Sequence, residues 1–390
     1  MAQQPTQYLV LGAGMMGSAV AYDLAMASAG NRVVLADLNS DTASAAARAI
    51  GPNVHPLQLD VRDSAALLRA MEGCGVAISA VSYSVNEAIT RAAIAAGVHL
   101  CDLGGNNDVV DRQMTFDAEA RARDVAVIPN CGLAPGLINI LAVTGIEAFD
   151  SVDAVRLRVG GLPQHPRPPL GYQLVFSAEG LLNEYLEPAE ILEEGTVRLV
   201  PSMTGLEEIV FPPPYGRLEA FYTSGGLSTL TRTLRGNVRA LDYKTIRYPG
   251  HCEKFRLLID LGFASAEPLL GAGGIRTSRE LFTELLKKRL ASDDSDVVLA
   301  RAVLTGLKDG QAQTLVYECV DVYDKRMRMT AMMRTTAFPT AITALMLTDG
   351  TITARGVMPP EACVPGQEMI RRLAQRHVIV TTQLSNGTVQ

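Results

Sequence analysis

Charged side chains gather around a Pro-Gly pair in TIRYPGHCEKFRLLIDLG, residues 245–262. Arg247 ends an alternating apolar and polar run, and a guanidinium there could hold a carboxylate through two parallel hydrogen bonds. His251 follows the turn, and an imidazole with an intrinsic pKa of about 6.5 could exchange a proton near neutral pH. The pattern predicts a strand, a turn and an amphipathic helix whose remaining charges face solvent. Arg247 and, more weakly, His251 therefore remain as candidate site residues.

A second chemical signal is a glycine-rich turn between an apolar run, QYLVL, and an alanine-rich helical pattern. Glycines in the G-x-G-x-x-G spacing let the chain turn sharply, let a pyrophosphate approach the backbone, and let the helix pack close to the strand. The free N–H groups of the helix N-terminus then face the phosphates. The residues expected to contact the dinucleotide are Gly12, Gly14, Met15, Met16 and Gly17.

Asp37 ends the next strand, RVVLAD, twenty residues after Gly17. A carboxylate at this point can accept hydrogen bonds from the ribose hydroxyls of the adenosine, and it repels a 2′-phosphate. The following residues, LNS, offer no arginine, and Arg32 lies at the wrong end of the strand. NAD is therefore the expected cofactor; the alternative for Asp37 is a helix cap or a solvated turn.

Strand and helix patterns keep alternating up to VAVIP, which predicts an α/β fold with a doubly wound parallel sheet of the Rossmann type. Ligands bind beyond the carboxyl ends of such strands. Four further cofactor contacts are expected there: Asp60, Val61, Ser82 and Tyr83. Asp102 ends the fifth strand and is the first carboxylate placed to meet both a nicotinamide and a substrate, although a turn-forming role is equally compatible with the glycines that follow it.

The pattern changes after about residue 140. VDAVRLRVG alternates as an antiparallel strand with one solvated face does, and later strands with single helices predict a second, α+β domain on a mixed or antiparallel sheet. Thr223 and Ser224 precede paired glycines whose N–H groups could bind an anion, although a plain turn is an equal alternative. The run MTAMMRTTAFPTAITALML predicts a buried helix.

Composition excludes several classes of protein. The net charge of −6 argues against a nucleic-acid partner, and no apolar stretch is long enough to cross a membrane. The 6 cysteines show no C-x-x-C spacing, so neither a metal site nor a disulfide framework is expected. MAQQPTQ does not read as a secretion signal. These features predict a cytoplasmic protein.

Five motifs in this order resemble the saccharopine dehydrogenase superfamily, and within it the bacterial NAD-dependent lysine 6-dehydrogenases. They are the glycine fingerprint, GLAPGL, PPLGYQLVFSAEGLLNEY, EAFYTSGGLSTL and TIRYPGHCEKFRLLIDLG. The resemblance implies a Rossmann domain over residues 1–140 that is completed by residues 335–390. It also implies a substrate-binding and oligomerisation domain over residues 141–334, in a homodimer or larger homo-oligomer.

The reaction implied by the resemblance is oxidation of L-lysine at C6 with NAD. The products would be NADH, ammonia and 2-aminoadipate 6-semialdehyde, which cyclises. In this interpretation Asp102 orients the amine and activates water, His251 is a weaker candidate base, and Arg247 holds the α-carboxylate. Tyr172, Thr223 and Ser224 would add hydrogen bonds to the substrate.

Glu179 stands near the position where saccharopine reductases are expected to carry an arginine for the extra carboxylates of saccharopine. A glutamate there suits an ammonium group and so favours free lysine, although an ordinary helix residue remains the alternative. Two other functions stay open. One is a saccharopine or carboxynorspermidine dehydrogenase that acts on a secondary amine, and the other is a non-catalytic NAD-binding sensor.

Overall fold

The computed structural model describes residues 6–175, 177–271, 274–291 and 294–387. The chain divides into two compact units. The first unit comprises Met1–Ala148, Ser228–Thr233 and Met333–Val380. The second comprises Phe149–Leu227, Leu234–Met332 and Thr381–Gln390. In the described part of the chain, no helix combines the length and apolar character needed to cross a bilayer.

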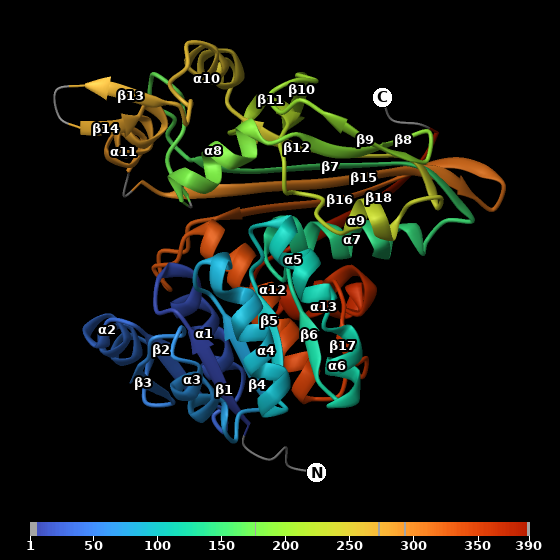
Figure 1. Ribbon diagram of the computed structural model, residues 1–390. Helices are drawn as coiled ribbons and strands as arrows, with labels where there is room; N and C mark the ends of the chain where they lie inside the picture. The colour runs from blue at the N-terminus through green and yellow to red at the C-terminus, as the bar shows by residue number, and fades with distance from the viewer. Residues whose placement is uncertain (1–5, 176, 272–273, 292–293, 388–390) are drawn as a thin grey trace. The chain divides into compact units, whose positions relative to one another are not determined.

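The first unit contains a parallel sheet of seven strands in the order β17-β6-β5-β4-β1-β2-β3 (Figure 1). The strand order reverses direction at β1, and open α/β sheets bind ligands beyond the carboxyl ends of the strands at such a point, here β1 and β4. This is the predicted Rossmann-type α/β fold. The strands are β1 (Gln7–Leu11), β2 (Arg32–Asp37), β3 (Val54–Gln58), β4 (Val76–Ser79), β5 (His99–Asp102), β6 (Ala126–Ile128) and β17 (Gly356–Val357).

Local sequence signals set where the helices of this unit begin. The side chain of Asn39 accepts the N–H groups of Asp41 and Thr42 at the start of α2, and Asp63 caps α3 in the same way. The helices are α1 (Met15–Ala27), α2 (Ser40–Ile50), α3 (Ser64–Met71), α4 (Asn86–Ala96), α5 (Asn107–Met114), α6 (Asp117–Ala122), α7 (Ile138–Ile146), α9 (Leu230–Thr233), α12 (Ala331–Thr348) and α13 (Gly366–Ala374), with the short η1 (Tyr83–Val85), η2 (Leu133–Leu137) and η3 (Pro360–Ala362).

The second unit is built on a mixed sheet of nine strands, in which the long strands β7, β15 and β16 run side by side (Figure 1). β7 pairs antiparallel with β15 and parallel with β12. The strands are β7 (Ser151–Pro163), β8 (Ala189–Glu193), β9 (Thr196–Val200), β10 (Glu207–Phe211), β11 (Gly216–Tyr222), β12 (Val238–Arg247), β15 (Asp296–Lys308), β16 (Gln311–Val322) and β18 (Val380–Asn386); β13 (Pro268–Gly271) and β14 (Gly274–Thr277) form a separate hairpin.

Three helices of the second unit share one apolar cluster: α8 (Ala178–Leu186), α10 (His251–Asp260) and α11 (Ser278–Leu290). Leu181 and Tyr185 of α8, Phe255 of α10 and Phe282 of α11 are buried in it. Their spacing along each helix puts them on one face. This core therefore fixes the directions in which the remaining side chains of α8 and α10 point.

The course of the chain departs from the predicted boundaries in two places. The last strand, β18, pairs with β16, so residues 381–387 belong with the second unit and not with the Rossmann sheet. Residues 228–233 leave the second unit and pack in the first. Ser228 and Thr229 make side-chain hydrogen bonds there, with Asn130 and Glu361 as partners. No periodic pattern marks so short an excursion.

Candidate active site

The glycine loop has the geometry that a dinucleotide requires. Gly12 has φ +98°, which favours glycine, and a Cβ on Gly17 would lie 1.8 Å from Gly12 O. A Cβ on Gly14 would meet nothing within 4 Å, so the loop is open at this point. No side chain caps the N-terminus of α1, and Met15 is 57% exposed. The chain thus offers uncapped N–H groups and open space, which together fit a pyrophosphate.

Asp37 is fixed by two backbone N–H groups at the end of β2. Its Oδ2 accepts Ala13 N at 2.8 Å and its Oδ1 accepts Asn39 N at 2.9 Å. The carboxylate is therefore tied to the glycine loop itself, and each oxygen keeps a second lone pair for a ribose hydroxyl.

The other predicted cofactor residues lie at the same edge but differ in their surroundings. Asp60 forms an exposed bidentate pair with Arg62, whose hydrogen bond lowers the pKa of Asp60 to about 2. Val61 packs against the core, and Ser82 caps η1. The ring of Tyr83 lies against the backbone of the next loop, because a Cβ on Gly105 would meet its Cδ1 at 3.1 Å.

Asp102 is buried, with 0% of its surface exposed, and both carboxylate oxygens are occupied. Oδ1 accepts the N–H groups of Gly104 and Asn130, and Oδ2 accepts Gln113 Nε2 at 2.7 Å. This geometry opposes the predicted contact with a substrate amine. The carboxyl end of β5 was located correctly, but the side chain turns back and holds the loop that follows. Burial raises the pKa of Asp102 against these hydrogen bonds.

Arg247 is the main charged group of the predicted substrate site. It ends β12 and is only 2% exposed. Nε donates to Tyr185 OH at 2.8 Å, and Nη1 donates to Thr245 Oγ1 and Ile246 O. The guanidinium also lies 4.6 Å from the centre of the Tyr172 ring. Within the described residues, no carboxylate forms an ion pair with Arg247 and no acceptor binds its Nη2; the carboxylate of Glu184 acts on this charge only electrostatically.

Two other predicted substrate residues have polar atoms without partners. Tyr172 OH and Thr223 Oγ1 are both buried and make no hydrogen bond. A buried hydroxyl without a partner costs about 1–3 kcal/mol. Arg247, which has no ion-pair partner, lies in the same unit as these two hydroxyls. Buried polar atoms without partners are typical of a site that binds a polar ligand.

Replacing Thr223 with valine should show whether its hydroxyl binds the substrate or has only a structural role. Because the hydroxyl has no partner within the protein, we expect the melting temperature to stay the same or rise. The KM for the amino-acid substrate should rise about tenfold, as expected for the loss of one hydrogen bond of about 1.4 kcal/mol. Thermal unfolding and steady-state kinetics on the one variant measure both effects. A lower melting temperature with an unchanged KM would show that the hydroxyl has only a structural role.

His251 is not a base in this structure. It is 1% exposed, and Nε2 lies 3.0 Å from Tyr185 OH while Nδ1 lies 3.0 Å from Leu170 O. Nδ1 must donate to the carbonyl, so Nε2 accepts from the tyrosine and the ring is neutral. Burial, with Arg247 second, lowers the pKa of His251 to about 3. These contacts oppose the predicted weaker role as a base, because both ring nitrogens are occupied and the imidazole orients Tyr185.

The carboxylate close to Arg247 is Glu184, which the sequence did not single out. Burial raises its pKa to about 7, with a smaller contribution from Glu187 and against the opposing effect of Arg247. Glu179, the predicted ligand, is instead exposed on the first turn of α8 and pairs with Lys287 at 3.9 Å. The sequence feature that could have identified Glu184 is its helical spacing. It follows Leu181 by one turn and so borders the buried face of α8.

Ser224 ties its loop to α8. Its N–H donates to Glu184 O at 3.0 Å, and its Oγ lies 3.4 Å from Asn183 O and 3.5 Å from Glu187 Oε2. The Ser224 hydroxyl thus faces a carbonyl and a carboxylate oxygen, an arrangement that opposes its predicted hydrogen bond to the substrate. Across the described ranges, no group of three or more His, Cys, Asp or Glu side chains is placed to hold a metal ion.

Comparisons with known proteins agree with these features. Residues 8–128 match the family model of the saccharopine dehydrogenase NADP binding domain, and residues 132–379 match that of the saccharopine dehydrogenase C-terminal domain. These matches support a nicotinamide dinucleotide as the cofactor of the glycine loop.

Two curated relatives are both saccharopine dehydrogenases of the NADP(+), L-glutamate-forming type. The Schizosaccharomyces pombe protein is 25% identical over 66% of this chain and 59% of its own length. The Saccharomyces cerevisiae protein is 23% identical over 95% of this chain and 97% of its own length. This chain thus spans little more than half of the first relative, and 48% of the Pyricularia oryzae protein.

A solved structure shows the same fold. Apo saccharopine dehydrogenase (L-Glu forming) from Saccharomyces cerevisiae superposes with a TM-score of 0.81 at 18% identity, covering 97% of this chain and 100% of the other. The family models together cover most of the sequence, and the fold agrees with them. The chain therefore belongs to the saccharopine dehydrogenase family.

Proposed function

We propose that this protein is an NAD-dependent L-lysine 6-dehydrogenase. It would release the 6-amino group of L-lysine as ammonia and form 2-aminoadipate 6-semialdehyde and NADH. A bound nicotinamide ring supplies the hydride acceptor. The protein's own part is to hold the carboxylate end of the substrate, to take a proton from the amine, and to position C6.

The observation that carries this proposal is the state of the buried cations in the second unit. Arg158 pairs with Glu207 and Asp242, and Lys244 pairs with Glu207. Among the buried cations described in this unit, Arg247 is the one without a carboxylate. One buried guanidinium without an ion-pair partner suits a substrate with one carboxylate, such as lysine, better than saccharopine, which carries several.

The amine end of the substrate requires a negative or basic group. Hydride leaves readily from a neutral amine, while free lysine has an ammonium pKa of about 10.4. Glu184 has a pKa of about 7 and is electrostatically coupled to Arg247. A carboxylate with that pKa attracts an ammonium and can accept its proton near neutral pH. We therefore assign to Glu184 the proton-accepting role that the sequence had given to Asp102.

NAD is proposed because Asp37 would place a carboxylate beside the adenosine ribose of a bound dinucleotide. We expect Asp37→Ser to weaken NAD binding by about 10- to 100-fold, since hydrogen bonds to a charged acceptor contribute about 1.5–3 kcal/mol. NADP binding should improve or stay constant, because the repulsion is removed. Fluorescence titration with both dinucleotides measures this. The control is Asp41→Ser. Asp41 is exposed near the start of α2, and its replacement should leave both affinities unchanged.

A substrate screen tests the activity itself. The purified protein should form NADH from NAD with L-lysine, and should release one equivalent of ammonia. Activity should increase from pH 7 toward pH 10 as more of the lysine amine becomes neutral. Formation of NADH from L-lysine without ammonia, or no turnover with any amine, would contradict the proposal.

The second candidate is saccharopine dehydrogenase, which the names of the curated relatives favour. It predicts turnover of saccharopine with release of glutamate and no ammonia. The same screen, run with saccharopine and with NADP, distinguishes the two reactions. A saccharopine activity would require cations beyond Arg247 to hold the extra carboxylates.

We also propose a cytoplasmic homodimer or larger oligomer. None of the cysteines in the described ranges forms a disulfide, which suits a reducing compartment. Apolar side chains are exposed on neighbouring strands of the second unit, with Leu307 45%, Val320 38% and Leu384 46% exposed. Light scattering on the purified protein would give the oligomeric state.

A further inference from the structure

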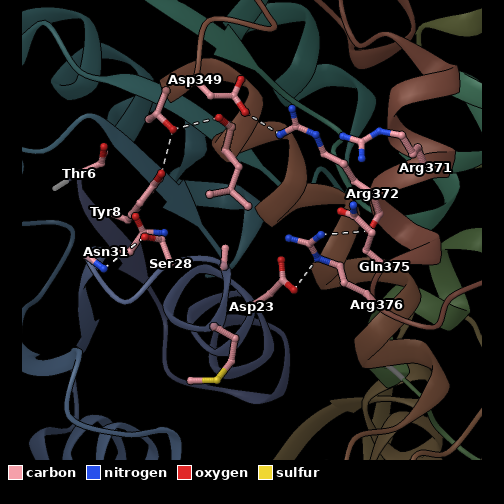
Figure 2. A pocket seen from close by; sticks show the side chains of 15 residues that line it. Thr6, Tyr8, Asp23, Ser28, Asn31, Asp349, Arg371, Arg372, Gln375 and Arg376 are labelled. Atoms are coloured by element: carbon pink, nitrogen blue, oxygen red, sulfur yellow. Dashed lines mark hydrogen bonds and ion pairs between the residues drawn. The ribbon is translucent and has the colours of Figure 1, made fainter. Parts of the chain in front are cut away.

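A cavity of about 430 Å³ lies in the first unit, beyond the amino ends of β1 and β2. Thr6 and Asn31, which immediately precede these strands, line it. It is thus at the edge of the sheet opposite the glycine loop, and the proposed function makes no use of it. We call it the amino-edge cavity; Figure 2 shows its lining.

The arginines of the amino-edge cavity are already neutralised. Each of the three guanidiniums that line it is within hydrogen-bond distance of at least one carboxylate. The pairs are Arg371 with Glu368, Arg372 with Asp349 and Glu368, and Arg376 with Asp23. Phosphate or carboxylate ligands would have to displace these partners, so the cavity is not arranged as an anion site.

Asp23 pairs with Arg376 through one carboxylate oxygen only, and its other oxygen lacks a hydrogen-bond partner. It is 5% exposed; Oδ1 accepts Arg376 Nε at 2.6 Å, whereas Oδ2 is buried and makes no hydrogen bond. Figure 2 shows the carboxylate pointing into the space between Asn31 and Arg376. Burial raises the pKa of Asp23 in spite of that arginine. The unsatisfied atom is therefore a hydrogen-bond acceptor, and a compact donor such as an ammonium group would satisfy it.

Three helix ends border the cavity. α1 ends at Ala27, α12 ends at Thr348 and α13 ends at Ala374, and residues of all three last turns line the cavity. The C-terminus of a helix carries a partial negative charge and free carbonyl oxygens, so it attracts cations. The last turns of α1 and α12 carry no basic residue, so these two ends favour a cation, whereas Arg371 and Arg372 already occupy the last turn of α13.

We propose that the amino-edge cavity binds the primary ammonium group of a small metabolite, of the size of a diamine or a basic amino acid. An ammonium group is compact and has three donors, which suit Asp23 Oδ2 and nearby carbonyl oxygens. The cavity volume is within the range of small-molecule sites, about 300–1,000 Å³.

The test is isothermal titration of the full-length protein with 1,5-diaminopentane. It is done in a Glu184→Gln background, so that attraction of the diamine to the proposed active site is reduced. We expect saturable binding that Asp23→Asn weakens at least about tenfold, the equivalent of one hydrogen bond of about 1.4 kcal/mol. Pentanedioate, which has the same length and the opposite charge, should not bind.

Two further variants keep the test decisive. Glu119→Gln removes one charge from the exposed surface of α6 in the same unit and should leave binding unchanged. Ser28→Trp fills the exposed rim of the cavity without touching Asp23, and should abolish binding even if Asp23→Asn folds poorly. Equal binding by all variants, or binding of pentanedioate instead, would overturn the proposal.

Discussion

Replacing Arg247 with methionine should lower kcat/KM for L-lysine by about 10²- to 10³-fold, because the loss of a buried charged partner costs about 2–5 kcal/mol. Methionine keeps most of the side-chain volume and removes the charge. The effect should appear mainly in KM, since the α-carboxylate is bound equally in the ground state and in the transition state. NAD affinity should not change. Initial rates over a range of L-lysine concentrations, with fluorescence titration of NAD, measure both.

Arg256→Met is the matched control. Arg256 lies on α10 of the same unit, and its side chain is exposed and 3.8 Å from Asp260. This variant should leave kcat/KM and NAD affinity unchanged. Arg247→Met should also lower the melting temperature, because Ile246 O and Tyr185 OH lose a donor. If the affinities for L-lysine and NAD fell by equal factors, Arg247 would have a structural role and the substrate assignment would be wrong.

Replacing Glu184 with glutamine should lower kcat by about 10²- to 10⁴-fold, the usual contribution of a general base. Glutamine has the same shape but cannot accept the proton of an ammonium group. In the wild-type protein, the rate should rise as Glu184 ionises around its pKa of about 7. That rise should be absent in the variant, while the dependence on the lysine ammonium at higher pH remains. A pH–rate profile from 5.5 to 10 for both proteins tests this.

The same variant should change stability in the opposite direction to activity. The pKa of Glu184 rises from 4.5 to about 7 on folding, so the folded state binds its proton more tightly than the unfolded state does. Ionised Glu184 therefore costs folding free energy, fully above pH 7 and not at all below about pH 4.5. Glu184→Gln should raise the melting temperature at pH 8 and leave it unchanged at pH 4.5. An equal effect at both pH values would indicate repacking.

Asp102→Asn is the comparison that distinguishes the two carboxylates. The amide that replaces the carboxylate keeps an acceptor for Gly104 N, and Gln113 can turn its own amide, because its Oε1 has no partner. We therefore expect this variant to lose far less activity than Glu184→Gln. A greater loss in Asp102→Asn, together with a shift in the pH–rate profile, would restore the original assignment of the base to Asp102.

Local sequence patterns determined the parts of this protein that depend on neighbouring residues. Glycine spacing, strand alternation and helix caps depend on contacts within one turn or one strand pair. The Rossmann-type fold and the glycine loop could therefore be predicted from the amino-acid sequence. Arg247 could be singled out for the same reason, because it lies at the predicted end of a strand; its substrate role is our proposal.

Burial and pairing across the fold were decided by the tertiary structure. Whether a carboxylate is free or fully hydrogen-bonded depends on groups far away in sequence: Asn130 and Gln113 occupy Asp102, while Tyr185 and Leu170 occupy His251. Glu184 has a raised pKa because the surrounding structure desolvates it. The sequence thus determined which elements carry the chemistry, and packing decided which side chains remain available, because desolvation is a property of the assembled core.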